Sequence, residues 1–180
     1  FQHLKDNDIY TIEDVIVNHP DVRKLYDNAA NSMRIITLLD ANKEVHVLYM
    51  VQKIGLNGSI IDNNCMFSPV DPETGKIKYP AHAGDTPLGI VYEVHPNTGI
   101  TIQGYQLPCV KEAIAMVKKA ALVVPQVRYV GWDVAVTPNG PIIIEGNTYC
   151  AHDFWQLPPH TPDKIGMLPT LKKLVPEFKF

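Results

Sequence analysis

The stretch that decides the fold runs from Tyr129 to Asn147 and reads Tyr-Val-Gly-Trp-Asp-Val-Ala-Val-Thr-Pro-Asn-Gly-Pro-Ile-Ile-Ile-Glu-Gly-Asn. Two apolar segments are joined here by Thr137-Pro138-Asn139-Gly140. A proline followed two residues later by a glycine is typical of a tight turn. We expect a hairpin with a three-residue loop and a glycine bulge, in which Thr137 lies opposite Pro141.

The predicted hairpin brings oxygen-bearing side chains together. Asp133 would lie directly opposite Glu145, and Asn147 would share the face of Glu145 because strand side chains alternate. Opposed carboxylates destabilise a sheet, and a divalent cation between them removes the repulsion. Such hard oxygen ligands suit magnesium or manganese rather than zinc. The alternative is a solvated acidic pair on an exposed sheet face. Apolar neighbours favour an interior position: Trp132, Val134, Val136, Ile142 and Ile144.

The segment from Gly131 to Pro141, followed by Glu145-Gly146-Asn147, resembles the metal-binding end of the ATP-grasp superfamily. It is similar in particular to the branch described as sugar-transfer-associated, or related to α-L-glutamate ligases. The resemblance runs from about Thr11 to the end of the sequence. It implies that the three oxygen-bearing side chains hold one or two Mg²⁺ (or Mn²⁺) ions that bridge the phosphates of ATP.

The beginning of the chain becomes apolar at Ile12 and predicts a strand that ends near Asn18, because the residue before Pro20 avoids helical angles. By resemblance, Glu13, Asp14, Val15 and Ile16 occupy the hinge whose backbone meets the adenine of ATP. Asn18-His19-Pro20 is similar to the Gln-His-Pro of that branch. An ordinary strand end is the alternative.

Arg34 stands out within residues 31–39, a predicted strand that pairs with a return strand over residues 45–54. A buried charge needs a partner, which is either an acid in a structural salt bridge or a phosphate group that fits the guanidinium fork. The segment resembles the family's Asn-Thr-Ile-Arg, whose arginine faces the transferred phosphate. Lys53 lies close to the position of another family arginine, and the resemblance therefore makes it a candidate cofactor-binding residue.

Residues 55–68 are predicted to form a loop. Within it, Asp62-Asn63-Asn64 resembles the Asp-Asn that precedes a Gly-Gly pair in relatives, but residues 65–68 are Cys-Met-Phe-Ser. Without those glycines the backbone loses close approach to a ligand. Short strands are expected around Ile77 and over residues 100–102, with a surface loop between them.

The segment from Leu107 to Val124 predicts an amphipathic helix, with Pro108 at its first position and Pro125 after its end. Its apolar stripe is expected to cover the sheet. Residues 148–162 are expected to be irregular, with His152 and Asp153 as candidates to touch metal or substrate. A last short helix is expected over residues 169–175.

Composition excludes several classes of protein. The chain has 180 residues, a net charge of −3 and scattered basic residues, which argues against a nucleic-acid or membrane surface. No stretch approaches the roughly 20 apolar residues of a membrane span. Three widely spaced cysteines indicate a reducing compartment, and we expect a cytoplasmic protein. The seven histidines show no regular metal-ligand spacing.

Strands, one long helix and a mostly antiparallel pattern predict a single α+β domain over residues 1–180. The resemblance makes it the C-terminal ATP-grasp lobe, and implies carboxylate–amine ligation. ATP would phosphorylate a small-molecule carboxylate, and an amine would attack the acyl phosphate, in peptide-like or cell-surface polysaccharide-linked biosynthesis. Arg34 would be the catalytic residue that offsets charge on the transferred group. The alternatives are a non-catalytic nucleotide-binding or scaffolding domain and a metal-dependent hydrolase that uses the same ligands.

The sequence contains no glycine-rich phosphate loop. ATP-grasp enzymes hold the nucleotide between two lobes, and the first lobe, which precedes the hinge, supplies a phosphate-binding lysine and a covering loop. We therefore expect these residues to lack the N-terminal lobe, to bind nucleotide weakly or not at all, and to show no ligase turnover on their own. An apolar patch where that lobe would pack could drive formation of a homodimer.

Overall fold

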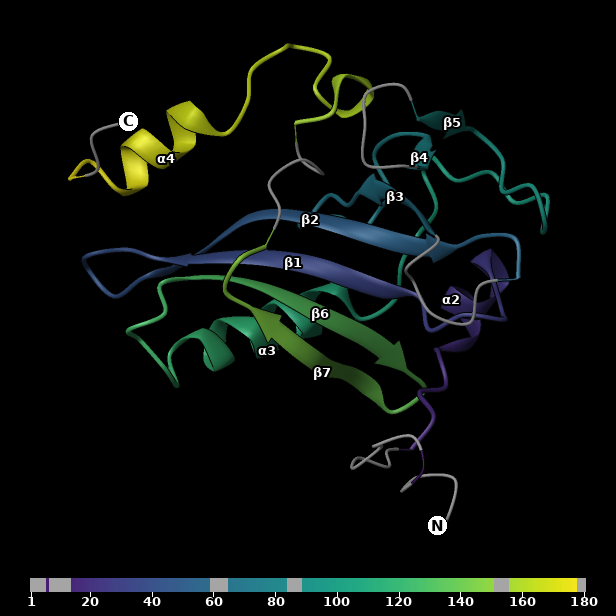
Figure 1. Cartoon of the computed structure of the whole chain (residues 1–180), viewed down its shortest axis with the longest axis horizontal. Helices are drawn as coiled ribbons and strands as arrows, with labels where there is room; N and C mark the ends of the chain where they lie inside the picture. The colour runs from purple at the N-terminus through teal and green to yellow at the C-terminus, as the bar shows by residue number, and fades with distance from the viewer. Residues whose placement is uncertain (1–5, 7–13, 59–64, 84–88, 151–155, 178–180) are drawn as a thin grey trace.

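The computed structural model describes residues 6, 14–58, 65–83, 89–150 and 156–177 (Figure 1). Its helices and strands follow in the order α2 (Pro20–Leu25), β1 (Ser32–Leu39), β2 (Val45–Gly55), β3 (Cys65–Pro69), β4 (Ala81–Ala83), β5 (Ile90–Tyr92), α3 (Val110–Ala121), β6 (Tyr129–Thr137), β7 (Gly140–Asn147), the 3-10 helix η2 (Pro158–His160) and α4 (Leu168–Leu174).

The strands form one seven-stranded sheet in the order β5-β4-β3-β2-β1-β6-β7, and every neighbouring pair is antiparallel. This arrangement confirms the predicted α+β class. The sheet is built from two hairpins, β1–β2 and β6–β7, which join side by side through β1 and β6. Among the described strands β7 is at the edge of the sheet, with β6 as its one neighbour.

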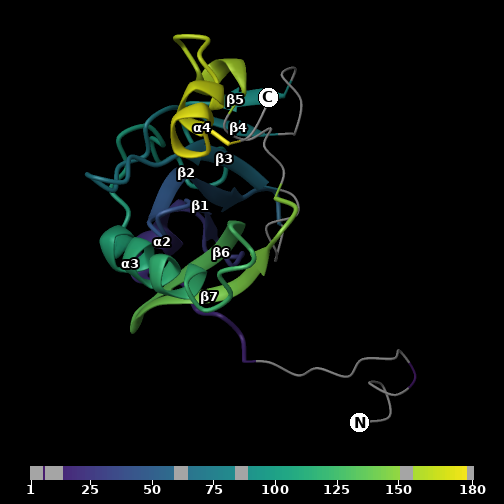
Figure 2. The same ribbon diagram turned by 90° about the vertical axis from the view of Figure 1, so that its left-hand side faces the viewer.

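One face of the sheet packs against α3 and forms the main core, which includes Met33, Ile35 and Val134. Figure 2 shows α3 beside β6 and β7. The predicted helix was too long at both ends. α3 begins at Val110, after Cys109 in a left-handed conformation (φ 54°), so Pro108 lies outside the helix.

The opposite face of the sheet is covered in part by the C-terminal segment. Leu157 packs on Val51 and Phe67, and Met167 packs beside Ile36. His160 lies against the rings of Phe67, Tyr79 and His82, with Phe67 edge-on at a centroid distance of 5.9 Å. The segment after β7 therefore crosses back over β2, β3 and β4. The predicted last helix is confirmed as α4.

Three expectations about local structure are wrong. Residues 14–19 form no strand; His19 N–H instead donates to the carbonyl of Val136 at 2.6 Å. Residues 65–68 belong to β3 rather than to a loop, because their side chains are mostly buried against the sheet. The region between Ile77 and residue 100 contains β4 and β5, and its His82 is fully buried.

Ile77 and Thr101, in the two short strands expected there, form only isolated β-bridges. Asp62, Asn63, Asn64, His152, Asp153 and Glu13 lie outside the described residues. In the part of the chain that is described, no helix has the length and hydrophobicity needed to cross a membrane.

Candidate functional site

The β6–β7 hairpin places Asp133 directly opposite Glu145, as predicted. The pairing of residues at the turn, however, differs from the predicted pairing. Thr137 pairs with Gly140 rather than with Pro141, so the register next to the turn differs by one residue from the expected one. An irregularity between Asp133 and Val134 then inserts an extra residue on β7 and restores the expected pairing. Gly140 has φ 108°, a conformation that L side chains rarely adopt.

The sheet register extends this pair into a row of side chains. Val51 on β2 is paired with Arg34 on β1, Arg34 with Asp133 on β6, and Asp133 with Glu145 on β7. Directly paired residues point to the same face of a sheet. The candidate site therefore crosses four adjacent strands, on the face opposite α3.

Asp133 lies between two cationic side chains. Both of its oxygens accept hydrogen bonds from Arg34, one from Nε and the other from Nη2 at 2.7 Å, and Lys53 Nζ lies 3.6 Å from Oδ2. The three side chains are 8–13% exposed, so water screens them little. The structure thus brings together Arg34, Lys53 and Asp133, and the acid that the salt-bridge alternative required for Arg34 is the predicted metal ligand itself.

Burial lowers the pKa of Arg34, but its hydrogen bonds to Asp133 and the nearby carboxylates outweigh this effect and raise the pKa overall. The guanidinium is therefore charged at every physiological pH. Among the described residues, the buried part of the site holds two cations and one carboxylate, which is an excess of positive charge. Such a site attracts anionic groups.

Glu145 and Asn147 lie at the accessible edge of the site. Glu145 is exposed, and Asn147 Nδ2 donates to its Oε1 at 3.0 Å, so the two side chains lie together as predicted. The expectation of an interior β7 is wrong, since Ile142 and Ile144 are 40% and 45% exposed. The reason is the position of β7 at the edge of the sheet, where β6 is its one neighbour among the strands that the structure describes.

The family described as sugar-transfer associated ATP-grasp matches residues 1–173. The chain belongs to this ATP-grasp family. It is accordingly an ATP-binding domain of the ligase type, and the family uses ATP together with a divalent metal. No curated protein and no solved structure shows a significant match to the chain.

The donor set of this ATP-grasp chain fits a hard divalent cation. Asp133 and Glu145 offer carboxylate oxygens and Asn147 offers an amide oxygen, within neighbouring rows of one sheet face. Mg²⁺ prefers oxygen ligands and usually shares its shell with waters and substrate phosphates. The residues present therefore suit Mg²⁺ or Mn²⁺.

A pocket lies against the hinge segment expected to meet adenine. It has a volume of about 730 Å³ and is lined in part by Asp14, Val15, Ile16 and Asn18, while Val15 is 88% exposed. Asn18 is buried, and its Oδ1 accepts no hydrogen bond from the described residues. The pocket continues to residues 29 and 30, directly before β1 and its Arg34.

Sequence reasoning missed Cys150 and Tyr129, which pack on the site face. A Cβ added at Gly131 would lie 2.6 Å from Cys150 Cβ, so the glycine leaves the space that Cys150 fills. Burial raises the pKa of the Cys150 thiol, which makes it unreactive near neutral pH. A glycine inside an otherwise apolar strand indicates such a close approach and was the available signal.

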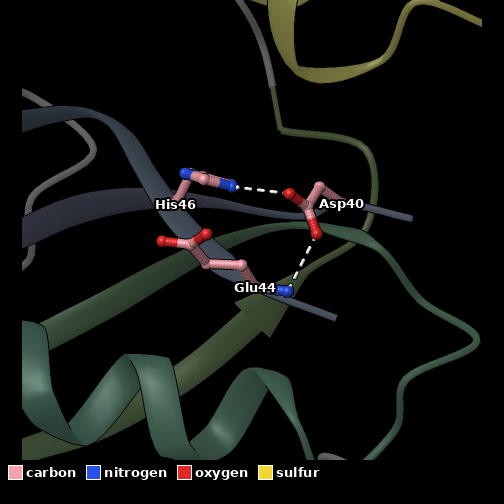
Figure 3. Close-up of side chains that lie close together, drawn as sticks. All are labelled: Asp40, Glu44 and His46. Carbon is pink, nitrogen blue, oxygen red and sulfur yellow. Dashed lines mark hydrogen bonds and ion pairs between the residues drawn. The ribbon is translucent and has the colours of Figure 1, made fainter. Parts of the chain in front are cut away.

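A second group of potential metal ligands, Asp40, Glu44 and His46, lies at the β1–β2 turn (Figure 3). Asp40 Oδ1 accepts the backbone amides of Asn42 and Glu44, and Oδ2 lies 3.0 Å from His46 Nε2. These contacts close the turn and lower the pKa of Asp40, with the His46 hydrogen bond as the main cause. The cluster is therefore explained by the local structure.

Proposed function

We propose that this chain is the ATP- and magnesium-binding lobe of a carboxylate–amine ligase that acts through an acyl phosphate. The observation that carries the proposal is the row formed by Arg34, Asp133 and Glu145. Together with Lys53, which lies beside Asp133, Arg34 places two buried cations next to the carboxylate oxygens of the donor set. Membership of the ATP-grasp family indicates that the nucleotide is ATP. The resemblance to α-L-glutamate ligases points to peptide-like or cell-surface polysaccharide-linked products.

Each group has a separate task in this proposal. Asp14, Val15 and Ile16 border the pocket for adenine. Asp133, Glu145 and Asn147 hold Mg²⁺, which when bound neutralises the charge of the phosphates. Arg34 and Lys53 supply positive charge beside the transferred phosphoryl group, where it lowers the barrier by electrostatic stabilisation.

The test is nucleotide binding by Glu145→Gln. The substitution keeps size and hydrogen bonding but removes one carboxylate charge, and because Glu145 is exposed the fold should be unaffected. We expect isothermal titration calorimetry to show that Mg²⁺-dependent ATP binding weakens about tenfold or more, as for loss of an ionic metal ligand.

A matched control is Glu112→Gln, which removes an exposed carboxylate from α3 on the other face of the sheet. That variant should bind Mg²⁺ and ATP as wild type does. Equal affinity of Glu145→Gln and wild type for ATP in Mg²⁺ would show that the metal assignment is wrong. ATP binding without any dependence on Mg²⁺ would count against the whole proposal.

A further inference from the structure

Asp133 has two competing partners: it is a proposed metal ligand, and it already forms an ion pair with Arg34. Nε and Nη2 of Arg34 contact both oxygens of Asp133, and Lys53 adds a third cationic contact. The side chains of Glu145 and Asn147, the other two proposed ligands, hydrogen-bond to each other and lie closer to solvent. The buried member of the donor set is therefore the one already neutralised by the chain's own cations.

A divalent cation at Asp133 would lie a few ångströms from a guanidinium that stays charged. Like charges at that distance repel, and partial burial makes the repulsion stronger than in water. A metal would therefore bind poorly while Arg34 remains on Asp133. A polyphosphate changes this balance, because phosphate oxygens offer the guanidinium fork an equivalent bidentate partner.

We infer that Arg34 is a gate on the metal site. In the nucleotide-free chain Arg34 pairs with Asp133, and when metal and ATP bind together Arg34 moves from Asp133 to the phosphates of ATP. This inference rests on the proposed function and adds that metal binding and polyphosphate binding are coupled. Metal and polyphosphate each remove an obstacle for the other, so their binding is positively cooperative. A purely structural ion pair would instead stay in place when both are present.

The first experiment measures Mn²⁺ binding without nucleotide, by electron paramagnetic resonance, in wild type and in Arg34→Gln. Removal of the guanidinium charge should raise the affinity for Mn²⁺ alone about tenfold or more. The same variant should bind ATP in Mg²⁺ more weakly than wild type, because a phosphate partner is lost. Tighter binding of Mn²⁺ alone together with weaker binding of ATP in Mg²⁺ is the combination that the gate predicts for this variant.

Asp133 keeps Lys53 as a partner in this variant, which favours a folded protein. The matched control is Arg128→Gln, which removes an arginine that contacts Leu39 and Glu177 away from the site. It should leave the affinity for Mn²⁺ unchanged. An Arg34→Gln variant that binds Mn²⁺ no better than wild type would overturn the inference.

A second measurement needs no variant. The Nε–H signal of Arg34 in ¹H–¹⁵N spectra of the wild-type chain should stay unchanged with Mg²⁺ alone and shift when Mg²⁺ and a non-hydrolysable ATP analogue are added together. A signal that stays at its nucleotide-free position in the fully loaded chain would overturn the gate.

The two proposals fail in different ways. If ATP binding requires Mg²⁺ and Glu145 while the Arg34 signal stays in place, only the gate is refuted. If wild type binds ATP without any dependence on Mg²⁺, the proposed function is refuted, and the gate with it.

Discussion

Asp133→Asn should destabilise the chain more than Arg34→Gln, although both substitutions break the same ion pair. Within the described part of the chain, the buried part of the site holds two cations and one carboxylate. Loss of Arg34 leaves a neutral pair, Asp133 with Lys53 at 3.6 Å. Loss of Asp133 removes the carboxylate that two neighbouring cations share, each of them 12–13% exposed.

The magnitudes follow from that difference. Arg34→Gln removes two charge-assisted hydrogen bonds but keeps Asp133 paired, so the free energy of unfolding should fall by about 2 kcal/mol. Asp133→Asn takes away the carboxylate that holds the buried Arg34 guanidinium by two hydrogen bonds and should cost about 4 kcal/mol. For a domain of this size these losses correspond to decreases in melting temperature of about 4–8 °C and about 8–16 °C.

Urea unfolding followed by circular dichroism, in the presence of EDTA, measures both free energies under metal-free conditions. Glu177→Gln serves as a control, because its pair with Arg128 is 36–45% exposed and should contribute less than about 1 kcal/mol. If Asp133→Asn were no more destabilising than Arg34→Gln, the reasoning that Lys53 is the second partner of Asp133 would be refuted.

Two further predictions concern other parts of the fold. Burial lowers the pKa of His95, and its hydrogen bond to the Gly55 carbonyl opposes this only in part; the unfolded chain therefore takes up a proton that the folded chain does not, and stability should decrease as pH falls below about 6.5. Urea unfolding at several pH values should show a weaker decrease for His95→Gln, and an unchanged pH dependence would contradict this. Leu157→Ala should cost about 2–4 kcal/mol, because Leu157 is 3% exposed against Val51 and Phe67. Limited proteolysis should then cut the C-terminal segment faster than in wild type, and equal cleavage rates would count against its docking on the sheet.

Local sequence patterns predicted the elements whose formation depends on residues that are close together in the chain. The Pro138-Asn139-Gly140 turn specified a hairpin, and alternation placed Asp133 and Glu145 on one face. The register at the turn was wrong by one residue because an extra residue on β7 compensates for it farther along. Such a bulge depends on how β7 pairs with its neighbour, and no local propensity specifies it.

The start of α3 and the burial of two histidines could not be predicted from local sequence patterns either. The apolar period of residues 110–121 predicted α3 and its packed face, but the left-handed Cys109 decided where the helix begins. His82 and His95 are polar residues in a segment rich in turn formers, which suggested a surface loop. Both are buried, because strands and aromatic neighbours distant in the sequence surround them.

The sequence by itself determined the class of fold, the ATP-grasp family and the three oxygen-bearing side chains of the hairpin, since these depend on residue types at short spacing. Only the tertiary structure decided that Arg34 pairs with Asp133, across strands far apart in the chain. Each is the only charged residue of its apolar strand, which indicated that both needed partners. Which partner each one has depends on the register between β1 and β6, and this register follows from packing of the whole sheet rather than from either strand alone.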